Sequence, residues 1–374
     1  MSTQASPAVT ARAAVLRKVG GPLEFEDISV HAPRADEVLV RMVGTGVCHT
    51  DILCRDGFPV PMPIVLGHEG SGIVEAVGPN VKKVRKGDHV VLAFNSCGHC
   101  GSCKDDHPAT CTQFLGMNFA GVRLEDGSTP LAQGSTPIHG VFFGQSSFST
   151  YAIAREVNAV PISNSVPLEL MGPLGCGVMT GAGAAINSLN MQRGQTLAIF
   201  GGGAVGLSAL LGAKAVDAGQ VFVVEPNAAR RKLALELGAT AVFDPRDGSD
   251  VVAAIKEASG GGVRYVIDTT GISAVIGQGI NCIIPGGTIA LVGVPPPDAA
   301  VPATLMDLLA KSVTLKPVTE GDANPQTFIP KMVALYKDGK FPFDKLITKF
   351  RFDQINEAMH ASESGTAIKP VLVF

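Results

Sequence analysis

The hydrophobic pattern changes character about halfway along the chain. From about residue 196, the short apolar runs "TLAIF", "VFVVE", "AVFD", "YVID" and "TIALVGV" are rich in β-branched residues and show no polar alternation. Such runs are typical of strands buried on both faces. Amphipathic or apolar helical stretches such as "NAARRKLALELGA" separate them. This alternation predicts an α/β fold with a doubly wound parallel sheet, closed by a sixth strand at "VTLKPV".

The first part of the chain follows a different pattern. The segments "EVLVRMVGTGVC", "GIVEAVG" and "DHVVLAF" resemble strands and are separated by glycine and proline. The tail from residue 345 predicts one helix and a final strand. We therefore expect a β-rich domain formed by residues 1–178 and 319–374, with a doubly wound domain, 179–318, inserted in it. A cleft between two such domains is a common place for a site.

Length and composition narrow the class of protein. A chain of 374 residues fits about two domains. A formal net charge of −3 provides no field that would attract nucleic acid. The start of the chain has no apolar signal core, and no apolar run is long enough to cross a bilayer. We expect a cytoplasmic protein without membrane or nucleic-acid partners, in which clustered cysteines bind metal more often than they form disulfides.

A glycine-rich turn predicts a dinucleotide site. The segment "IFGGGAVGLSALLG" places Gly201, Gly203 and Gly206 in a G-x-G-x-x-G pattern between a predicted strand and a predicted helix. The next predicted strand ends in Glu225. Glycines allow a tight turn and a close approach of the backbone to a pyrophosphate at the helix N-terminus. The alternative is a glycine-rich turn that binds nothing.

The acidic residue after the second strand favours NAD over NADP. A carboxylate at Glu225 accepts hydrogen bonds from ribose hydroxyls and repels a 2′-phosphate. The neighbouring cations Arg230 and Arg231 would tolerate that phosphate, which leaves the choice of coenzyme open.

Four of the eight cysteines form a ladder, C-x2-C-x2-C-x7-C. Four thiolates complete a tetrahedron around zinc and leave no position for a reactant, which is typical of a structural site. An iron–sulfur cluster is the alternative, but the usual run ends in x3-C-P, whereas here the last gap is seven residues. The ladder consists of Cys97, Cys100, Cys103 and Cys111.

A second, more widely spaced set of candidate ligands lies elsewhere in the chain. "TGVCHTD" contains Cys48, "GHEGSG" contains His68 and Glu69, and "GPLGCGV" contains Cys176. Two cysteines and one histidine leave one position of a tetrahedral zinc open, as catalytic sites do. Taken singly, each of these residues fits ordinary core packing at least as well as it fits metal binding.

The motif "GHEGSGIVEAVGPNV" resembles the GHE-x2-G-x5-G-x2-V pattern of zinc-containing alcohol dehydrogenases in the medium-chain dehydrogenase/reductase family. The likeness covers essentially the whole chain. It implies a GroES-like catalytic domain with an inserted Rossmann domain. It also implies that Cys48, His68 and Cys176 bind a catalytic zinc with Glu69 beside it, and that the cysteine ladder binds a structural zinc, giving two zinc ions per chain.

The resemblance further implies the roles of residues near the metal. Zinc would polarise the alcohol oxygen, and Thr50 would accept the alcohol proton. A histidine that relays this proton in many relatives is replaced here by Leu53. Asp51 is expected either to orient a ligand histidine or to cap a turn.

The cofactor contacts implied by the resemblance come from both parts of the chain. His49 would contact a cofactor phosphate, Thr180 would pack on the nicotinamide and Lys369 would lie near the pyrophosphate. Arg230 and Val294 complete the expected set. The family forms dimers and tetramers, so a homodimer or homotetramer is expected.

The segment "IHGVFFGQSSFSTYAIA" resembles bacterial aryl-alcohol dehydrogenases and related terpene-alcohol enzymes. An apolar pocket of Phe94, Met117, Phe142 and Phe143 would then receive primary aromatic or allylic alcohols and yield aldehydes, with NAD as oxidant. Ordinary core packing is the alternative for each of these side chains. Competing functions are dehydrogenation of aliphatic alcohols, polyols or glutathione adducts, or a non-enzymatic zinc protein that senses redox state.

Overall fold

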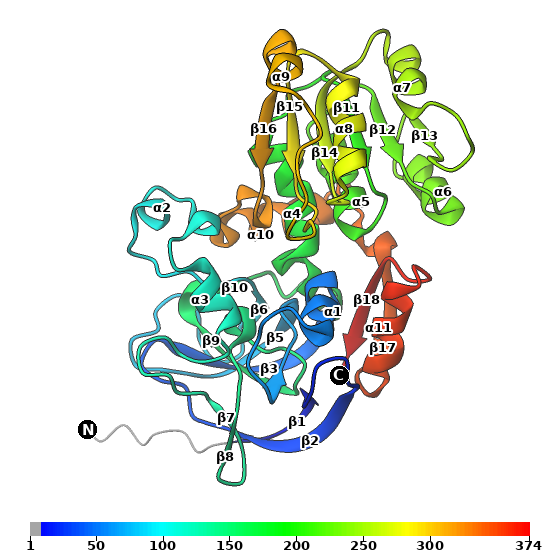
Figure 1. The fold of residues 1–374 in the computed structure, drawn as a ribbon. Coiled ribbons are helices and arrows are strands. Elements are labelled where there is room, and N and C mark those ends of the chain that lie inside the picture. Colours follow the sequence, from blue (N-terminus) through cyan, green and yellow to red (C-terminus); the bar gives the residue numbers. More distant parts are fainter. Residues whose placement is uncertain (1–8) are drawn as a thin grey trace. The chain divides into compact units, whose positions relative to one another are not determined.

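The computed structural model describes residues 9–374 (Figure 1). The first residues of the chain, in which the sequence shows no apolar signal core, lie outside the described residues. The chain divides into two compact units. The first unit comprises residues 1–176, 324–334 and 344–374, and the second comprises 177–323 and 335–343. The sequence places its expected boundaries after 178 and after 318, whereas the compact units divide after 176 and after 323. The short return of the chain at 335–343 was not expected.

The second unit is built on the predicted parallel sheet. Within the described residues its strands lie in the order β13-β12-β11-β14-β15-β16, and every neighbouring pair is parallel. This is the doubly wound order in which the strand sequence reverses beside the first strand. The predicted fold class and the sixth strand are confirmed. The strands are β11 (Leu197–Phe200), β12 (Val221–Val224), β13 (Ala241–Phe243), β14 (Val263–Asp268), β15 (Ile283–Leu291) and β16 (Thr314–Pro317).

Helices pack alongside this sheet (Figure 1). Apolar residues of the helices Val251–Ser259 and Ser273–Cys282 form one core with the strands, which includes Phe200, Phe222 and Ile255. The sequence pattern did not predict α8, because two glycines and several β-branched residues weaken its helical signal. The helices are α4 (Gly177–Gly183), α5 (Ala204–Ala215), α6 (Ala228–Glu236), α7 (Val251–Ser259), α8 (Ser273–Cys282) and α9 (Leu305–Lys311).

The first unit contains two mainly antiparallel sheets. One has the order β4-β1-β2-β7-β8; the other has the order β10-β6-β5-β3-β18-β17, with β9 also pairing with β3. The predicted N-terminal strands are β3, β5 and β6, whereas β17 was not expected. The strands are β1 (Val9–Leu16), β2 (Leu23–Val30), β3 (Glu37–Gly46), β4 (Ile64–Val65), β5 (Gly70–Val77), β6 (His89–Leu92), β7 (Leu131–Gln133), β8 (Thr136–Ile138), β9 (Tyr151–Arg155), β10 (Ala159–Pro161), β17 (Ile347–Arg351) and β18 (Lys369–Val373).

Short helices connect the strands of the first unit. They are α1 (His49–Asp56), α2 (Gly101–Lys104), α3 (Phe114–Phe119) and α11 (Ile355–Glu363), while α10 (Pro325–Lys337) begins in the first unit and ends in the second. Among the described residues, no helix combines the length and apolar content needed to cross a bilayer.

The turn between β11 and α5 shows why glycine is needed in the predicted dinucleotide motif. Gly201 has φ of +99°, a conformation that other residues rarely adopt. A Cβ atom at Gly206 would lie 1.8 Å from the carbonyl oxygen of Gly201, so the helix could not pack so closely on the strand. At Gly203 a Cβ atom would meet only the Arg230 guanidinium, at 4.0 Å. The backbone at Gly203 therefore faces open space.

These two glycines predict different effects on stability. We expect Gly206→Ala to lower the free energy of unfolding by about 1–3 kcal/mol, because the added methyl group overpacks the helix–strand contact. Gly203→Ala is the matched control and should cost less than about 1 kcal/mol, from a poorer N-cap. Urea denaturation of the cofactor-free protein measures both. Equal losses would contradict the packing argument.

Candidate active site

The widely spaced candidate ligands meet within the first unit. Cys48 is the N-cap of α1, His68 and Glu69 lie directly before β5, and Cys176 follows a short turn at Gly172–Gly175. One ligand atom from each of the four lies within 4.8 Å of the others. Segments far apart in sequence thus bring two sulfurs, an imidazole nitrogen and a carboxylate oxygen to one place.

A buried carboxylate orients the histidine of this group. Asp51 Oδ1 lies 3.0 Å from His68 Nδ1 and accepts a hydrogen bond from the Gly67 N–H, while its Oδ2 accepts one from the Cys48 N–H. Both Asp51 and His68 are fully buried. Asp51 therefore combines the two roles considered from sequence, because it holds the imidazole and also caps the first turn of α1.

The other imidazole nitrogen is what a metal would bind. His68 Nε2 is buried and has no hydrogen-bond partner among the described residues, which would be costly without a ligand. Two thiols lie beside it. The hydrogen bond to Cys176 lowers the pKa of the Cys48 thiol well below its ordinary value, despite the opposing effect of burial. Thiolate and neutral imidazole are the donors that zinc prefers, so the residues present fit a zinc ion.

Glu69 is held by a buried ion pair. Lys369 Nζ lies 2.8 and 2.9 Å from the two carboxylate oxygens and donates to the Val47 carbonyl at 3.2 Å. Burial raises the pKa of Glu69, and the ammonium opposes that rise. The three N–H donors of Lys369 are thus occupied and the residue is 3% exposed. Lys369 is thus buried against Glu69, and its expected position near a cofactor pyrophosphate stays a prediction.

The remaining residues of α1 differ in their burial and in their contact with the ligands. Thr50 Oγ1 is 3.9 Å from the Cys48 sulfur, and His49 is exposed. Leu53 is half-buried. Cys54 is fully buried, and burial raises the pKa of its thiol. Cys54 is therefore a core residue rather than a further ligand.

Two phenylalanines contact the His68 ring. Phe143 stacks on it with ring centroids 4.5 Å apart, and Phe142 approaches edge-on at 5.5 Å. Both come from the short turn Phe142–Gly144, in which Phe143 has left-handed dihedral angles of φ 49° and ψ 34°. Val141 before it is also left-handed, with φ of 50°. Such conformations cost about 1–3 kcal/mol each outside glycine, and they tend to occur at functional sites.

The aromatic contacts extend beyond the predicted pair. Phe119 lies 5.0 Å from Phe143, and Phe114 links Phe143 to Phe94 through contacts of 6.3 and 5.5 Å. Sequence reasoning missed Phe114 and Phe119, since nothing in the segment "FLGMNF" shows which face meets the site. Met117, on the same helix, packs instead against the cysteine ladder.

The cysteine ladder also closes on itself. Its four sulfurs lie within 4.8 Å of one another, with Cys97–Cys103 at 3.9 Å and Cys100–Cys111 at 4.0 Å. A zinc tetrahedron with Zn–S bonds of ~2.3 Å has sulfurs ~3.8 Å apart. Backbone N–H groups point at the sulfurs, and those of Cys103 and Thr112 lower the pKa of Cys100 to about 5. The arrangement fits a structural zinc ion.

The second unit presents the predicted dinucleotide residues at the carboxyl ends of its strands. Glu225 accepts hydrogen bonds from the N–H groups of Gly202, at 2.6 Å, and Asn227, at 2.8 Å. Arg231 pairs with Asp244 at 2.9 Å. The buried Nε of Arg230 has no hydrogen-bond partner among the described residues.

Two further cofactor residues expected from sequence lie in the second unit. Thr180 Oγ1 donates to Glu320 at 3.4 Å, a partner that sequence reasoning did not identify. Val294 follows β15 and is 62% exposed.

Comparison with known proteins agrees with this geometry. Residues 34–164 match the alcohol dehydrogenase GroES-like domain family, and residues 204–338 match the zinc-binding dehydrogenase family. The chain is 64% identical to geraniol dehydrogenase of Castellaniella defragrans over 366 residues, 98% of each protein.

Solved structures are similarly close. A benzyl alcohol dehydrogenase from Acinetobacter calcoaceticus has a TM-score of 0.95 at 44% identity and covers 98% of this chain and 99% of its own. An alcohol dehydrogenase zinc-binding domain protein from Burkholderia ambifaria has a TM-score of 0.96 at 48% identity, with coverage of 98% and 99%. The non-enzymatic alternative therefore has no support. The chain belongs to the zinc-containing alcohol dehydrogenases of the medium-chain dehydrogenase/reductase family.

Proposed function

We propose that this alcohol dehydrogenase oxidises primary aromatic and allylic alcohols to aldehydes, reversibly, with NAD as the hydride acceptor. The observation that carries the proposal is the Phe143 ring stacked on the ligand imidazole of His68. An aromatic wall next to the metal ligands favours flat, unsaturated groups on the carbon that bears the hydroxyl. The similarity to a geraniol dehydrogenase and a benzyl alcohol dehydrogenase supports the same class.

Each residue of the site has a role in this proposal. Cys48, His68 and Cys176 would hold the zinc ion, which supplies Lewis-acid polarisation of the alcohol oxygen when bound. Asp51 keeps the proton of His68 on Nδ1, so that Nε2 presents its lone pair. Thr50, beside Cys48, would take the proton of the alcohol hydroxyl while releasing its own hydroxyl proton to water. The cysteine ladder would hold the second, structural zinc ion.

The preference for NAD rests on the charges at the end of β12. The Glu225 carboxylate is buried and accepts hydrogen bonds from two backbone N–H groups. These bonds fix the carboxylate at the end of β12. A carboxylate there repels a 2′-phosphate. Arg231 is paired with Asp244, and this pairing leaves Arg230 as the cation next to the open backbone of Gly203.

We further propose that the second unit forms a homodimer contact. Within residues 9–374, strand β16 is an edge of the sheet, so one row of its backbone groups has no neighbouring strand. The adjacent helix α9 exposes apolar side chains, with Leu305 85%, Met306 69% and Leu309 72% exposed. An exposed apolar patch beside an open strand edge is typical of an interface between copies of one chain.

A substrate panel tests the proposed reaction. We expect kcat/KM for benzyl alcohol and geraniol to exceed that for ethanol and glycerol, with NAD preferred to NADP and two zinc ions per chain in the same preparation. Phe143→Ala should reduce the preference for benzyl alcohol over ethanol about tenfold, because a ring contact worth ~1.4 kcal/mol is lost. Phe25→Ala, in β2, is the control. A higher kcat/KM for ethanol or glycerol in the unaltered enzyme would refute the substrate class.

The role of Asp51 can be tested through metal retention. Asp51→Asn should weaken zinc binding at the His68 site by ~10–100-fold, because an amide cannot accept all the hydrogen bonds that the carboxylate accepts. After dialysis against a chelator, we expect the variant to keep only the ladder zinc. Asp250→Asn, at the N-cap of α7, is the control and should retain both ions. An Asp51→Asn protein with two tightly bound zinc ions would contradict the assigned role.

The proposed dimer contact can be tested by charge. Leu305→Glu combined with Leu309→Glu should shift the protein toward monomer, since like charges on both copies then oppose association. Sedimentation equilibrium gives the mass directly. Leu115→Glu, on the exposed surface of α3 in the first unit, is the control. If the double variant keeps the oligomeric state of the unaltered protein, α9 is not at the interface.

A further inference from the structure

A pocket of about 220 Å³ lies in the first unit behind the turn that carries Phe142 and Phe143. Val141 and Gly144, on either side of these two rings, line the pocket, whereas the rings themselves contact His68. The pocket is thus distinct from the group of metal ligands. Its apolar lining consists of Met117, Val122, Leu124, Val141, Ile153 and Ala154.

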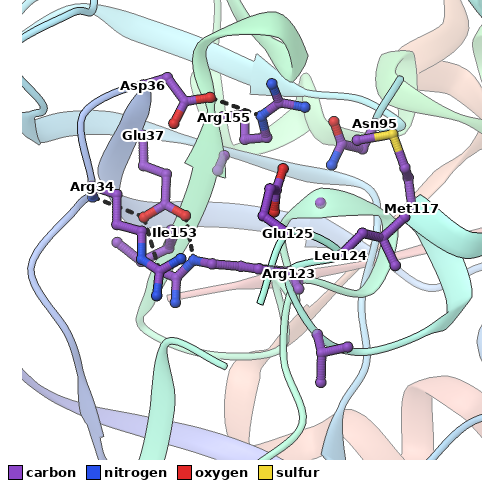
Figure 2. Close-up of a pocket in the computed structure, with 14 residues that line it drawn as sticks. Arg34, Asp36, Glu37, Asn95, Met117, Arg123, Leu124, Glu125, Ile153 and Arg155 are labelled. Carbon is purple, nitrogen blue, oxygen red and sulfur yellow. Dashed lines mark hydrogen bonds and ion pairs between the residues drawn. The ribbon is translucent and has the colours of Figure 1, made fainter. Parts of the chain in front are cut away.

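The charged residues around this pocket balance one another. Three arginines and three carboxylates line it, so their formal charges cancel. Figure 2 shows Arg123 paired with Glu37 and Arg155 paired with Asp36, with shortest N–O distances of 2.6 and 3.0 Å. Arg34 pairs with Asp126 at 2.9 Å, outside the pocket. Because the cations have partners of their own, a neutral ligand fits the pocket better than an anion.

One polar side chain in the pocket has unused hydrogen-bonding capacity. Asn95 is 7% exposed, and its Oδ1 is buried without a hydrogen-bond partner among the described residues. The Asn95 backbone is held by the Asn118 side chain, through contacts of 2.8 and 3.0 Å. Figure 2 shows the Asn95 carboxamide at the same end of the pocket as Met117. A buried unpaired acceptor costs ~1–3 kcal/mol, which a ligand donor would recover once the carboxamide turns its oxygen toward the pocket.

The chemistry of the lining defines the ligand. A carboxamide offers both an acceptor and a donor, and a hydroxyl group matches both at once. The rest of the ligand must be apolar to pack on the aliphatic side chains. A dry apolar cavity of ~150 Å³ is large enough for benzene, so the present volume suits a molecule with one ring. We propose that this pocket is a second binding site for a small apolar alcohol, whose hydroxyl group bonds to the Asn95 carboxamide.

A ligand in this pocket would contact the turn that carries Phe143. An occupant that packs on Val141 supports the left-handed turn that places Phe143 on the His68 ring. Binding at the pocket therefore stabilises the aromatic wall of the metal site without contact with the metal ligands. The binding itself is independent of the proposed oxidation, because it requires neither cofactor nor turnover.

A fluorescence titration tests the site. The chain contains no tryptophan, so Leu124→Trp, at the partly exposed rim, introduces a single indole reporter. We expect cyclohexylmethanol, added to the zinc-loaded protein without cofactor, to produce a saturable change in its emission. In the same background, Asn95→Leu should raise the Kd at least tenfold, and Val122→Phe should abolish the change by filling the pocket. Glu24→Gln, exposed on β2 and outside the lining, is the control and should leave the Kd unchanged.

Several outcomes would overturn the proposal. One is an emission change that does not saturate. A second is a Kd that Asn95→Leu and Val122→Phe leave unchanged, measured in variants whose thermal unfolding is unaltered. The amine cyclohexylmethylamine provides another, since tighter binding of the amine, lost in Glu125→Gln, would assign the pocket to cations instead. Because the titration contains no NAD, a failure of the alcohol panel would leave its result unchanged.

Discussion

The geometry of the candidate active site depends on one buried carboxylate. Asp51 has no access to water, and its two oxygens are surrounded by three donors that come from different segments, namely the Cys48 N–H, the Gly67 N–H and the His68 ring. A buried charge is tolerated only when it is paired or hydrogen-bonded. The carboxylate therefore draws the start of α1 and the segment before β5 together, and this brings the Cys48 sulfur to His68 Nε2.

A second buried interaction, an ion pair, supports the same site. The ion pair between Lys369 and Glu69 joins the final strand, β18, to the residue next to the ligand histidine. Removal of either partner would leave an uncompensated buried charge, which is strongly destabilising. Gly46 makes this arrangement possible, since a Cβ atom there would lie 1.9 Å from a Glu69 oxygen. The last strand of the chain thus helps to support the residues of the site.

The aromatic wall illustrates how strain and burial offset each other. Left-handed backbone at Val141 and Phe143 is unfavourable, yet the turn places two large rings in buried contact with the ligand imidazole. Burial of a phenylalanine side chain contributes ~1.5–3 kcal/mol, which is comparable to the cost of the backbone. The same turn forms one wall of the pocket at Asn95, so this pocket and the metal-ligand group share a single strained element.

Local patterns in the sequence carried much of the fold and many of the candidate residues. The strands of the second unit are continuous apolar runs, and the turn after β11 needs glycine within a few residues, so both could be predicted. The spacing of the cysteine ladder likewise indicated a closed site, since its members are close along the chain. By contrast, β17 and α8 were missed because half-exposed strands and glycine-containing helices have weak periodicity.

Contacts between distant segments were decided only by the tertiary structure. The resemblance identified Glu69 and Lys369, but nothing in either motif showed that the two residues, 300 positions apart, form a buried ion pair. Nor did the sequence show that Phe114 and Phe119 join the aromatic wall, or that Met117 packs against the cysteine ladder. The physical reason is that hydrophobic periodicity reports which residues are buried, whereas their partners depend on how the sheets and loops pack together.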